Sequence, residues 1–304
     1  MTPTIDIIIP TYRPDHTFVE MITRLLKQTY PIQQIIIMNT ESNRFPDDIF
    51  DLDHRIQVHT IAPQEFDHGG TRHQAATLSH SDLMLFMTQD AMPVNSKLIE
   101  ELVHPFRDDN VMAAYARQLA KNSSNVIEAY TRSYNYPSNS HIHSASDLPI
   151  MGIKTYFCSN VCAVYRKKSY TQLGGFVTRT IFNEDMIMAA QIIKSGYKVA
   201  YVADAQVIHS HEYSMKQLLQ RNFDLAVSQT DFPEVFQDIK STDEGLRYVK
   251  KVIRYLIESS NHLLIPRFLC ESGFKYVGYK LGSIYKSLPM CVIKKITMNP
   301  NYWK

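Results

Sequence analysis

The N-terminal part of the chain alternates short apolar runs with longer stretches in which apolar residues recur every three or four positions. The runs predict strands, and the longer stretches predict amphipathic helices. In order, the pattern gives strand 5–9, a helix between its N-cap Asp15 and Tyr30, strands 34–38 and 56–61, helix 71–79, strand 83–88, helix 95–106 and strand 111–117. Strands that alternate with helices indicate an α/β fold with a mostly parallel sheet. Ligands of such sheets bind beyond the carboxyl ends of the strands, so the residues after each strand are the candidates for function.

The second part of the chain has a less regular pattern. Residues 133–146 are rich in Ser, Asn, His and Tyr and predict a loop. Strand 161–165, helices 167–173 and 185–194, and strands 198–202 and 206–208 follow. Beyond Ser214 the apolar residues take helical spacing. We therefore expect an α/β domain over residues 1–225 and a helical C-terminal segment over 226–304.

Composition limits the class of protein. The 304 residues are 44% hydrophobic and 20% charged, which is ordinary for a soluble globular chain and excludes disorder and low-complexity sequence. The longest aliphatic runs, such as 7–9, are far shorter than the roughly 20 residues that span a bilayer. The N-terminus has neither the basic nor the apolar region of a secretion signal. Because four cysteines give no disulfide scaffold, we expect a reducing, cytoplasmic compartment.

Charge is unevenly distributed. Residues 245–304 contain eleven Lys and Arg and two acidic residues, a net charge of +9, whereas the rest of the chain carries −7. Tyrosines, Trp303 and aliphatic residues at helical spacing from Val249 onward are interleaved with these basic residues. Such a mixture is typical of a helix that lies in the plane of an anionic membrane surface. Helices packed on the body of the protein, or a homodimer interface, are the alternatives, and the acidic remainder argues against nucleic acid as a partner.

Two groups of acidic residues lie where chemistry is expected. Asp90 follows a predicted strand, in the sequence Thr88-Gln89-Asp90, where a carboxylate points into the ligand crevice and can hold a divalent cation. Glu184 and Asp185 precede a helix, whose dipole favours a carboxylate, and a carboxylate there can act as a general base. Each group has a structural alternative, which is to cap the helix that follows it.

A histidine pair and a glycine-rich motif complete the candidates. His209 and His211 come directly after strand 206–208, and their side chains point the same way only if the strand continues, so they are not a self-contained metal pair. One of them can join Asp90 as a ligand, and a structural role is the alternative. Gly69-Gly70-Thr71-Arg72 lies between a strand and a helix, where glycines let the backbone approach a phosphate and Arg72 can donate to it.

The order of these motifs resembles that of the inverting family 2 glycosyltransferases. The resemblance covers residues 3–225 and is carried by Pro10-Thr11-Tyr12, Gly69-Gly70-Thr71-Arg72, Thr88-Gln89-Asp90, Gly174-Gly175-Phe176, Glu184-Asp185 and His209. Within that family, residues 66–72, 88–93 and 207–213 are most similar to bacterial rhamnosyltransferases of polysaccharide assembly. The resemblance implies a GT-A fold, with a nucleotide-sugar half at about 1–118 and an acceptor half at about 119–225.

The resemblance also implies roles for single residues. Asp185 is the catalytic base with Glu184 beside it, and Asp90 and His209 hold a divalent metal, Mg²⁺ or Mn²⁺. The family's first acidic residue in the metal motif is Thr88 here, and Asn39 stands where an acidic residue is usual after the second strand. The residues expected to contact the nucleotide sugar are Pro10, Thr11, Tyr12, Arg13, Asn39, Gly70, Arg72, Thr88, Gln89 and Asp90.

The implied function is transfer of a sugar with inversion, from dTDP-L-rhamnose to a growing, lipid-linked cell-surface polysaccharide. The enzyme would then be peripherally attached to the inner face of the plasma membrane. A UDP-hexose donor, a sugar-nucleotide pyrophosphorylase and a non-catalytic scaffold of a membrane assembly are the alternatives. The pyrophosphorylase is disfavoured because its glycine-rich loop follows the first strand of the chain, whereas this motif follows the third.

Overall fold

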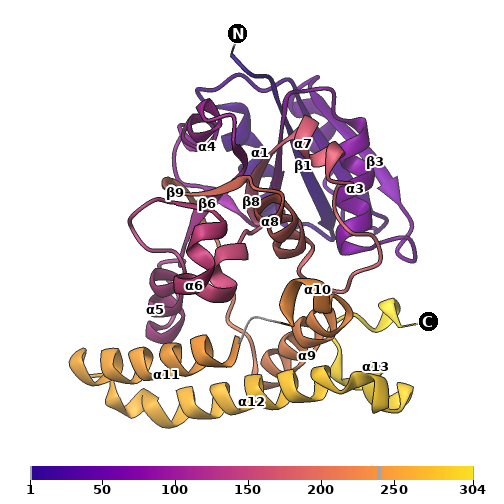
Figure 1. Ribbon diagram of the computed structural model, residues 1–304. Coiled ribbons are helices and arrows are strands. Elements are labelled where there is room, and N and C mark those ends of the chain that lie inside the picture. The colour runs from indigo at the N-terminus through magenta and orange to yellow at the C-terminus, as the bar shows by residue number, and fades with distance from the viewer. Residues whose placement is uncertain (1, 238–240, 304) are drawn as a thin grey trace.

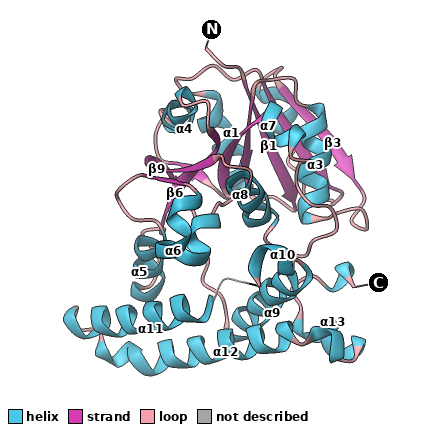
Figure 2. Cartoon of the chain, in the orientation of Figure 1, coloured by secondary structure: helices cyan, strands magenta, loops and turns pink. Residues whose placement is uncertain are grey.

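The computed structural model describes residues 2–237 and 241–303, which form a mixed sheet covered by helices and a separate helical layer at one end (Figures 1 and 2). The sheet has nine strands in the order β3-β2-β1-β4-β8-β6-β9-β5, with β7 paired to β9. Six strands run in one direction, and β5, β7 and β8 run against them, so the predicted mostly parallel sheet is confirmed. The strands are β1 (Ile5–Tyr12), β2 (Gln34–Thr40), β3 (Ile56–Ile61), β4 (Leu83–Met87), β5 (Met92–Pro93), β6 (Val111–Leu119), β7 (His141–His143), β8 (Cys162–Arg166) and β9 (Lys198–Ile208).

The two faces of the sheet each bury an apolar core, because successive side chains of a strand point to opposite faces. Ile7 and its neighbours on one face pack against α1 (His16–Leu26), α2 (Ile49–Leu52) and α4 (Leu98–Val103). Ile8 and Ile36 on the other face pack against α3 (His68–Leu78), α7 (Lys167–Gln172) and α8 (Glu184–Lys194). This double covering explains why the strands read as continuous apolar runs in the sequence.

Local signals placed several elements correctly. Asp15 is the N-cap of α1, and its carboxylate accepts a hydrogen bond from the Thr17 N–H at 2.9 Å, as expected for a capping aspartate. Phe18, Ile22 and Leu25 face the core from the predicted side of that helix. The strands β1 to β4 lie within two or three residues of their predicted positions.

Three expectations were wrong. Residues 126–135 form helix α5 (Val126–Asn135), and the predicted loop 133–146 also contains β7. The two strands predicted at 198–202 and 206–208 are one strand, β9, whose register with β6 shifts between Ala116 and Arg117. Helix α3 begins at His68, so Gly69 and Gly70 lie in its first turn instead of in a loop before it.

The C-terminal segment forms the helical layer at the end of the body, seen at the bottom of Figure 1. It contains α9 (Met215–Asp231), α10 (Pro233–Phe236), α11 (Ser241–Glu258), α12 (Ile265–Ser283) and α13 (Met290–Ile296). Helix α12 packs very closely on α9, since a Cβ atom at Gly278 would lie 2.2 Å from the Leu219 carbonyl oxygen and one at Gly282 would lie 2.3 Å from that of Phe223. The domain boundary expected at residue 225 falls inside α9.

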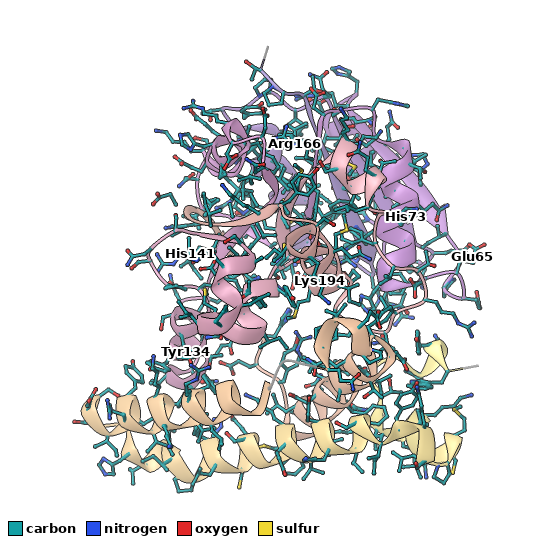
Figure 3. The ribbon with its side chains drawn as sticks, viewed as in Figure 1. Glu65, His73, Tyr134, His141, Arg166 and Lys194 are labelled. Atoms are coloured by element: carbon teal, nitrogen blue, oxygen red, sulfur yellow. The ribbon has the colours of Figure 1, made fainter. Side chains whose placement is uncertain are left out.

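The apolar face of α11 is turned inward, which corrects the expectation that it faces a membrane. Val252 and Leu256 are fully buried in a cluster with Ile127 of α5 and Phe268 of α12. Tyr255 stacks on Tyr130 at a ring distance of 4.2 Å. Helix α11 therefore packs on the body of the protein, which was the alternative to a membrane-facing helix. Tyr134, labelled in Figure 3, extends this contact from the end of α5, with its ring 5.3 Å from that of Tyr248 in α11.

No helix in the described ranges 2–237 and 241–303 is both long enough and apolar enough to cross a membrane. Lys304, one of the eleven basic residues counted in the tail, lies outside the described residues.

Candidate active site

The ends of β4, β6 and β9 meet the N-terminus of α8 around a cavity of about 390 Å³, called the central cavity below. It brings together six of the residues expected in the site: Arg72, Thr88, Asp90, Glu184, Asp185 and His209. These residues come from four separate stretches of sequence, and their convergence follows from the parallel strands, whose carboxyl ends share one edge of the sheet.

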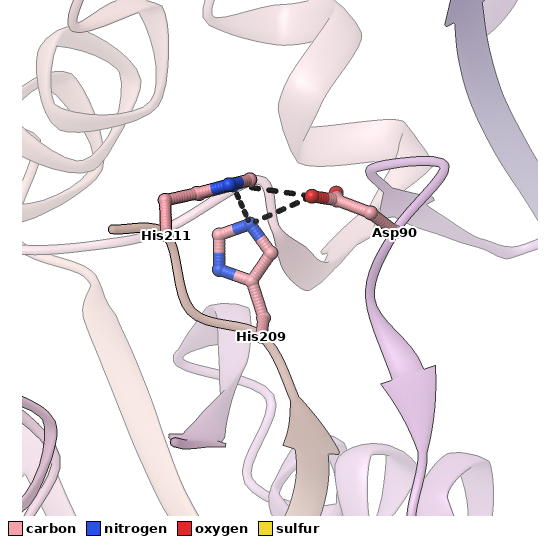
Figure 4. Close-up of side chains that lie close together, drawn as sticks. All are labelled: Asp90, His209 and His211. Carbon is pink, nitrogen blue, oxygen red and sulfur yellow. Dashed lines mark hydrogen bonds and ion pairs between the residues drawn. The ribbon is translucent and has the colours of Figure 1, made fainter. Parts of the chain in front are cut away.

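Asp90 and two histidines form a compact cluster on one side of the central cavity (Figure 4). The Nε2 atoms of His209 and His211 lie 3.5 and 3.1 Å from Asp90 Oδ2 and 3.0 Å from each other. Adjacent ligands of an octahedral ion at about 2.1 Å are roughly 3.0 Å apart, so these separations fit a single divalent cation. The structure therefore adds His211 to the ligands expected from the sequence.

The surroundings of His209 prepare it to bind a cation. Its Nδ1 lies 3.0 Å from Gln118 Oε1, which also accepts a hydrogen bond from Arg132 at 2.6 Å. Because that oxygen can only accept, Nδ1 carries the hydrogen and the Nε2 lone pair faces Asp90. Burial lowers the pKa of His209 to about 3, so the ring is neutral at pH 7. Burial alone would raise the pKa of Asp90, but the hydrogen bond from His211 and the proximity of His209 hold it below its usual value. Carboxylate oxygens and imidazole nitrogens are ligands that divalent metals accept.

Asp185 lies in the first turn of α8, on the wall of the same cavity. The residue before the helix, Asn183, has a φ of 64°, a left-handed conformation that is uncommon for a residue other than glycine and is found at functional sites. Oδ2 of Asp185 accepts a hydrogen bond from the Asn160 N–H at 3.0 Å, and Oδ1 accepts one from the Met186 N–H at 2.8 Å. Burial and the neighbouring charge of Glu184 nevertheless raise the pKa of Asp185 to about 7. A carboxyl group with this pKa is suited to take up a proton near neutral pH.

Glu184 is turned away from Asp185 toward α3. Its Oε1 lies 3.1 Å from Arg72 Nη1 and accepts a hydrogen bond from Asn160 Nδ2 at 3.3 Å. Burial opposes ionisation of Glu184, but the charge of Arg72 holds its pKa below the usual value. Arg72 is thus largely committed to a buried ion pair, and its Nε is buried without a partner in the described part of the chain.

The two glycines expected to approach a phosphate have a packing role instead. A Cβ at Gly69 would lie 1.8 Å from the Val177 carbonyl oxygen, so only glycine fits there. The Gly70 N–H donates to the N-cap residue Asp67, which satisfies it inside the helix terminus. Gly70 does not line the central cavity.

One more residue expected to bind the nucleotide, Tyr12, lines a second cavity of about 340 Å³. Tyr12 and Thr40, at the ends of β1 and β2, line it together with Phe66 and His68. His68 also lines the central cavity, so the two cavities adjoin at this residue. Asn39 was expected at the nucleotide, but it is buried and accepts a hydrogen bond from Thr11 at 3.1 Å, and the next residue, Thr40, faces the cavity instead.

Gln89, Arg13 and Pro10 line neither cavity, and the first two contact Tyr12. The Gln89 side chain pairs with the backbone of Tyr12, donating to its carbonyl at 3.1 Å and accepting from its N–H at 2.8 Å. The guanidinium carbon of Arg13 lies 5.0 Å from the centre of the Tyr12 ring, and the backbone of Arg13 has a φ of 47°. Pro10 lies in β1, opposite Met38 of β2.

Sequence reasoning missed several residues of the site. His211 was set aside because the two histidines were expected to point the same way only if the strand continued; β9 ends at Ile208, yet the bend after it lets both rings converge. Gln118 sits inside a strand and carries no sequence signal of its own. Arg132 lies on the helix that was not predicted, and Asn160 in a loop without a motif.

Two curated rhamnosyltransferases are similar to this chain over almost its whole length. O-antigen chain rhamnosyltransferase WbaN of Salmonella anatum is 38% identical over 304 residues, which cover 99% of this chain and 96% of WbaN. RfbN of Salmonella typhimurium, also an O-antigen chain rhamnosyltransferase, is 37% identical over 98% of this chain and 96% of its own length.

Solved structures share the fold. Mannosyltransferase PcManGT from Pyrobaculum calidifontis, in complex with GDP-Man and Mn²⁺, has a TM-score of 0.66 at 11% identity and covers 95% of this chain and 89% of its own. TarS 1–349 of S. aureus, in complex with UDP-GlcNAc, has a TM-score of 0.54 at 13% identity, with 92% and 90% covered. The expected GT-A fold is thereby confirmed. A model of the glycosyltransferase like family 2 matches residues 3–224, and the chain belongs to that family.

Proposed function

We propose that this enzyme transfers L-rhamnose from dTDP-L-rhamnose, with inversion, to a hydroxyl group of a growing, lipid-linked cell-surface polysaccharide. The observation that carries the proposal is that Asp185, with a pKa of about 7, shares one cavity with the Asp90–His209–His211 cluster. The rhamnose and the polysaccharide are suggested by the two Salmonella relatives, both of which are O-antigen chain rhamnosyltransferases.

Different residues of the central cavity have different roles in such a transfer. The Asp185 carboxylate takes the proton of the acceptor hydroxyl as its oxygen forms a bond to C1 of the sugar. The bond from C1 to the diphosphate breaks on the opposite side, which inverts the anomeric centre in one displacement. Glu184 pairs with Arg72 and keeps the pKa of Asp185 high.

Asp90, His209 and His211 are the residues that would hold a divalent cation, Mg²⁺ or Mn²⁺. Such a cation supplies positive charge that stabilises a leaving diphosphate. Gln118 and Arg132 fix the orientation of His209 for this purpose.

The donor is tested by measuring thermal stability with nucleotides. A ligand that binds only the folded state raises the melting temperature according to its affinity, so we expect dTDP to raise it more than UDP or GDP at equal concentration. A clear preference for UDP would contradict the rhamnose donor and favour the UDP-hexose alternative, while membership of the family would stand.

We also propose that the enzyme is peripherally attached to the anionic inner face of the plasma membrane. The face involved is the outer side of α12 and not that of α11. Leu269, Tyr276 and Val277 of α12 are exposed, as are Leu263 just before it and Ile284 just after it, with exposed fractions between 48% and 84%. Lys280, Lys286, Lys294 and Lys295 are exposed near them in the sequence, and this mixture suits an anionic lipid surface.

Flotation with anionic vesicles tests the membrane face. The doubly substituted V277E/K280E chain changes three units of charge, each worth about 1 kcal/mol near an anionic leaflet, so we expect roughly 100-fold weaker partition at low salt. F50E/K27E, which alters exposed residues of the sheet domain by the same charge, is the matched control and should float like the unaltered chain. Equal loss in both variants, or in neither, would contradict this assignment.

A further inference from the structure

The C-terminal hook, defined as residues 297–303, returns from α13 toward the sheet domain (Figure 1). Residues 298–302 form one wall of the second cavity, facing Tyr12, Thr40, Phe66 and His68 on the other side. The hook lies outside the stretch matched by the family model, which ends at residue 224. The cavity beside the central cavity is therefore built jointly by the family domain and the extension.

The hook is held in place at both ends. Thr297, 2% exposed, donates its hydroxyl hydrogen to Asp224 Oδ1 at 2.6 Å, and the Met298 N–H donates to Oδ2 at 2.9 Å. The far end is attached by the Tyr302 hydroxyl, which donates to the Arg179 carbonyl at 3.1 Å. The ring of Trp303 packs beside Phe223 and Tyr285. These contacts make the hook a fixed wall.

Thr40 and Asn301 both line the second cavity. The hydroxyl of Thr40 is buried, with the residue 3% exposed, and has no hydrogen-bond partner among the described residues. A buried hydroxyl without a partner is costly, so a ligand that bonds to it gains affinity. Across the cavity, the exposed amide of Asn301 offers both a donor and an acceptor.

The position of the second cavity beside the central cavity, and the residues that line it, indicate which ligand group could occupy it. Because they adjoin at His68, a ligand whose diphosphate lies near Asp90 can extend its nucleoside into the second cavity. Phe66 and Tyr12 supply aromatic faces on which a base can stack. The amide of Asn301 and the Thr40 hydroxyl supply the hydrogen bonds that the edge of a pyrimidine requires.

We propose that the C-terminal hook closes the cavity for the pyrimidine base of the donor, and that Asn301 and Thr40 hold the base from opposite sides. This inference rests on the proposed function for the identity of the donor. It assigns nucleotide recognition to a segment outside the family domain.

Calorimetric titration of the full chain with dTDP, in the presence of MgCl₂, tests the hook. Each of N301A and T40V removes one neutral hydrogen bond, so we expect dTDP affinity to fall roughly 3–10-fold in each. Inorganic pyrophosphate, which lacks a base, should bind the variants and the unaltered chain equally. T40V removes a hydroxyl that has no hydrogen-bond partner among the described residues, so the melting temperature of this variant should not fall. N139A, at an exposed asparagine outside the cavity, is the control.

The outcomes separate the two proposals. If the unaltered chain binds none of dTDP, UDP and GDP, the proposed function fails. If it binds dTDP and both variants bind it equally well, the role of the hook is overturned. Equal weakening of dTDP and pyrophosphate would also overturn it, because the substitutions would then act on the diphosphate and not on the base.

Discussion

Replacing Asp185 by Asn is expected to lower kcat by about 10²–10⁴, the range that removal of a general base produces. The amide cannot take up the proton of the acceptor hydroxyl. Affinity for dTDP should remain nearly unchanged, because Asp185 belongs neither to the Asp90–His209–His211 cluster nor to the cavity lined by Tyr12 and Thr40. Initial rates of transfer and titration with dTDP measure the two effects separately.

The control for this substitution must exclude damage to the fold. Both Asp185 oxygens accept backbone N–H groups, and an amide can accept only one of them, so some loss of stability is expected. Asp204, an exposed aspartate in β9, provides the matched D204N variant, which should keep full activity. Loss of dTDP binding in D185N would make Asp185 a structural residue and contradict its role as the base.

The pH dependence of kcat supplies a second check on Asp185. Its raised pKa means that the carboxyl is protonated below about pH 7 and cannot accept a proton, so activity should rise with pH through that region and then level off. Since the charge of Glu184 helps to raise the pKa of Asp185, the midpoint of the pH profile should move to lower pH in E184Q. An acid limb that does not move would show that another group controls it.

Substitution in the Asp90–His209–His211 cluster, the proposed metal site, is expected to have the second large effect. Asp90→Ala removes a proposed ligand and should weaken Mn²⁺ binding by at least about 100-fold, with loss of the activity that EDTA inhibits. The reason is that loss of a residue that only orients a ligand already costs about 10–100-fold in metal affinity, and loss of the ligand itself should cost at least as much. His211→Ala should also weaken binding, because the structure places its Nε2 3.1 Å from Asp90 Oδ2. Electron paramagnetic resonance of free Mn²⁺ measures the affinity.

The cluster offers internal controls. His54 is 92% exposed at its side chain and lies outside the cavity, so H54A should bind Mn²⁺ normally. Gln118→Leu, which leaves all three ligands in place but releases His209, should have an intermediate effect. Full activity of D90A, or activity that EDTA does not inhibit, would refute the metal site.

The parts of the fold that the sequence predicted are those that local forces determine. Strands β1, β2 and β4 are covered on both faces, and their continuous apolar runs can be read directly, whereas β3 is recognised by its alternation. Helix α5 was missed because its polar residues are not confined to an exposed face. Thr131 bonds to Tyr248 of α11 and Arg132 donates to Gln118 of β6, and the apolar residues of α5 are covered only by contact with α11 and α12. Helix formation there depends on tertiary packing more than on the local pattern.

The candidate site was predicted where single residues follow a strand end or begin a helix. Asp90, Asp185 and His209 come together in the central cavity as expected. The partners that tune them are absent from any motif, because Gln118 is placed by the pairing of β6 with β9 and Asn160 by the loop before β8. His211 required knowledge of where β9 ends, which periodicity does not give to the nearest residue.

The close packing of α12 on α9 has a consequence for inheritance. Gly278 and Gly282 touch the backbone of α9, and Asp224 in the same helix holds the hook, although the stretch matched by the family ends at residue 224. Recombination between relatives at the end of that stretch would join an α9 from one parent to a tail shaped for another. Viable hybrids should therefore inherit α9, α12 and the hook from the same parent, so that the segment after Ser214 passes between lineages as a block.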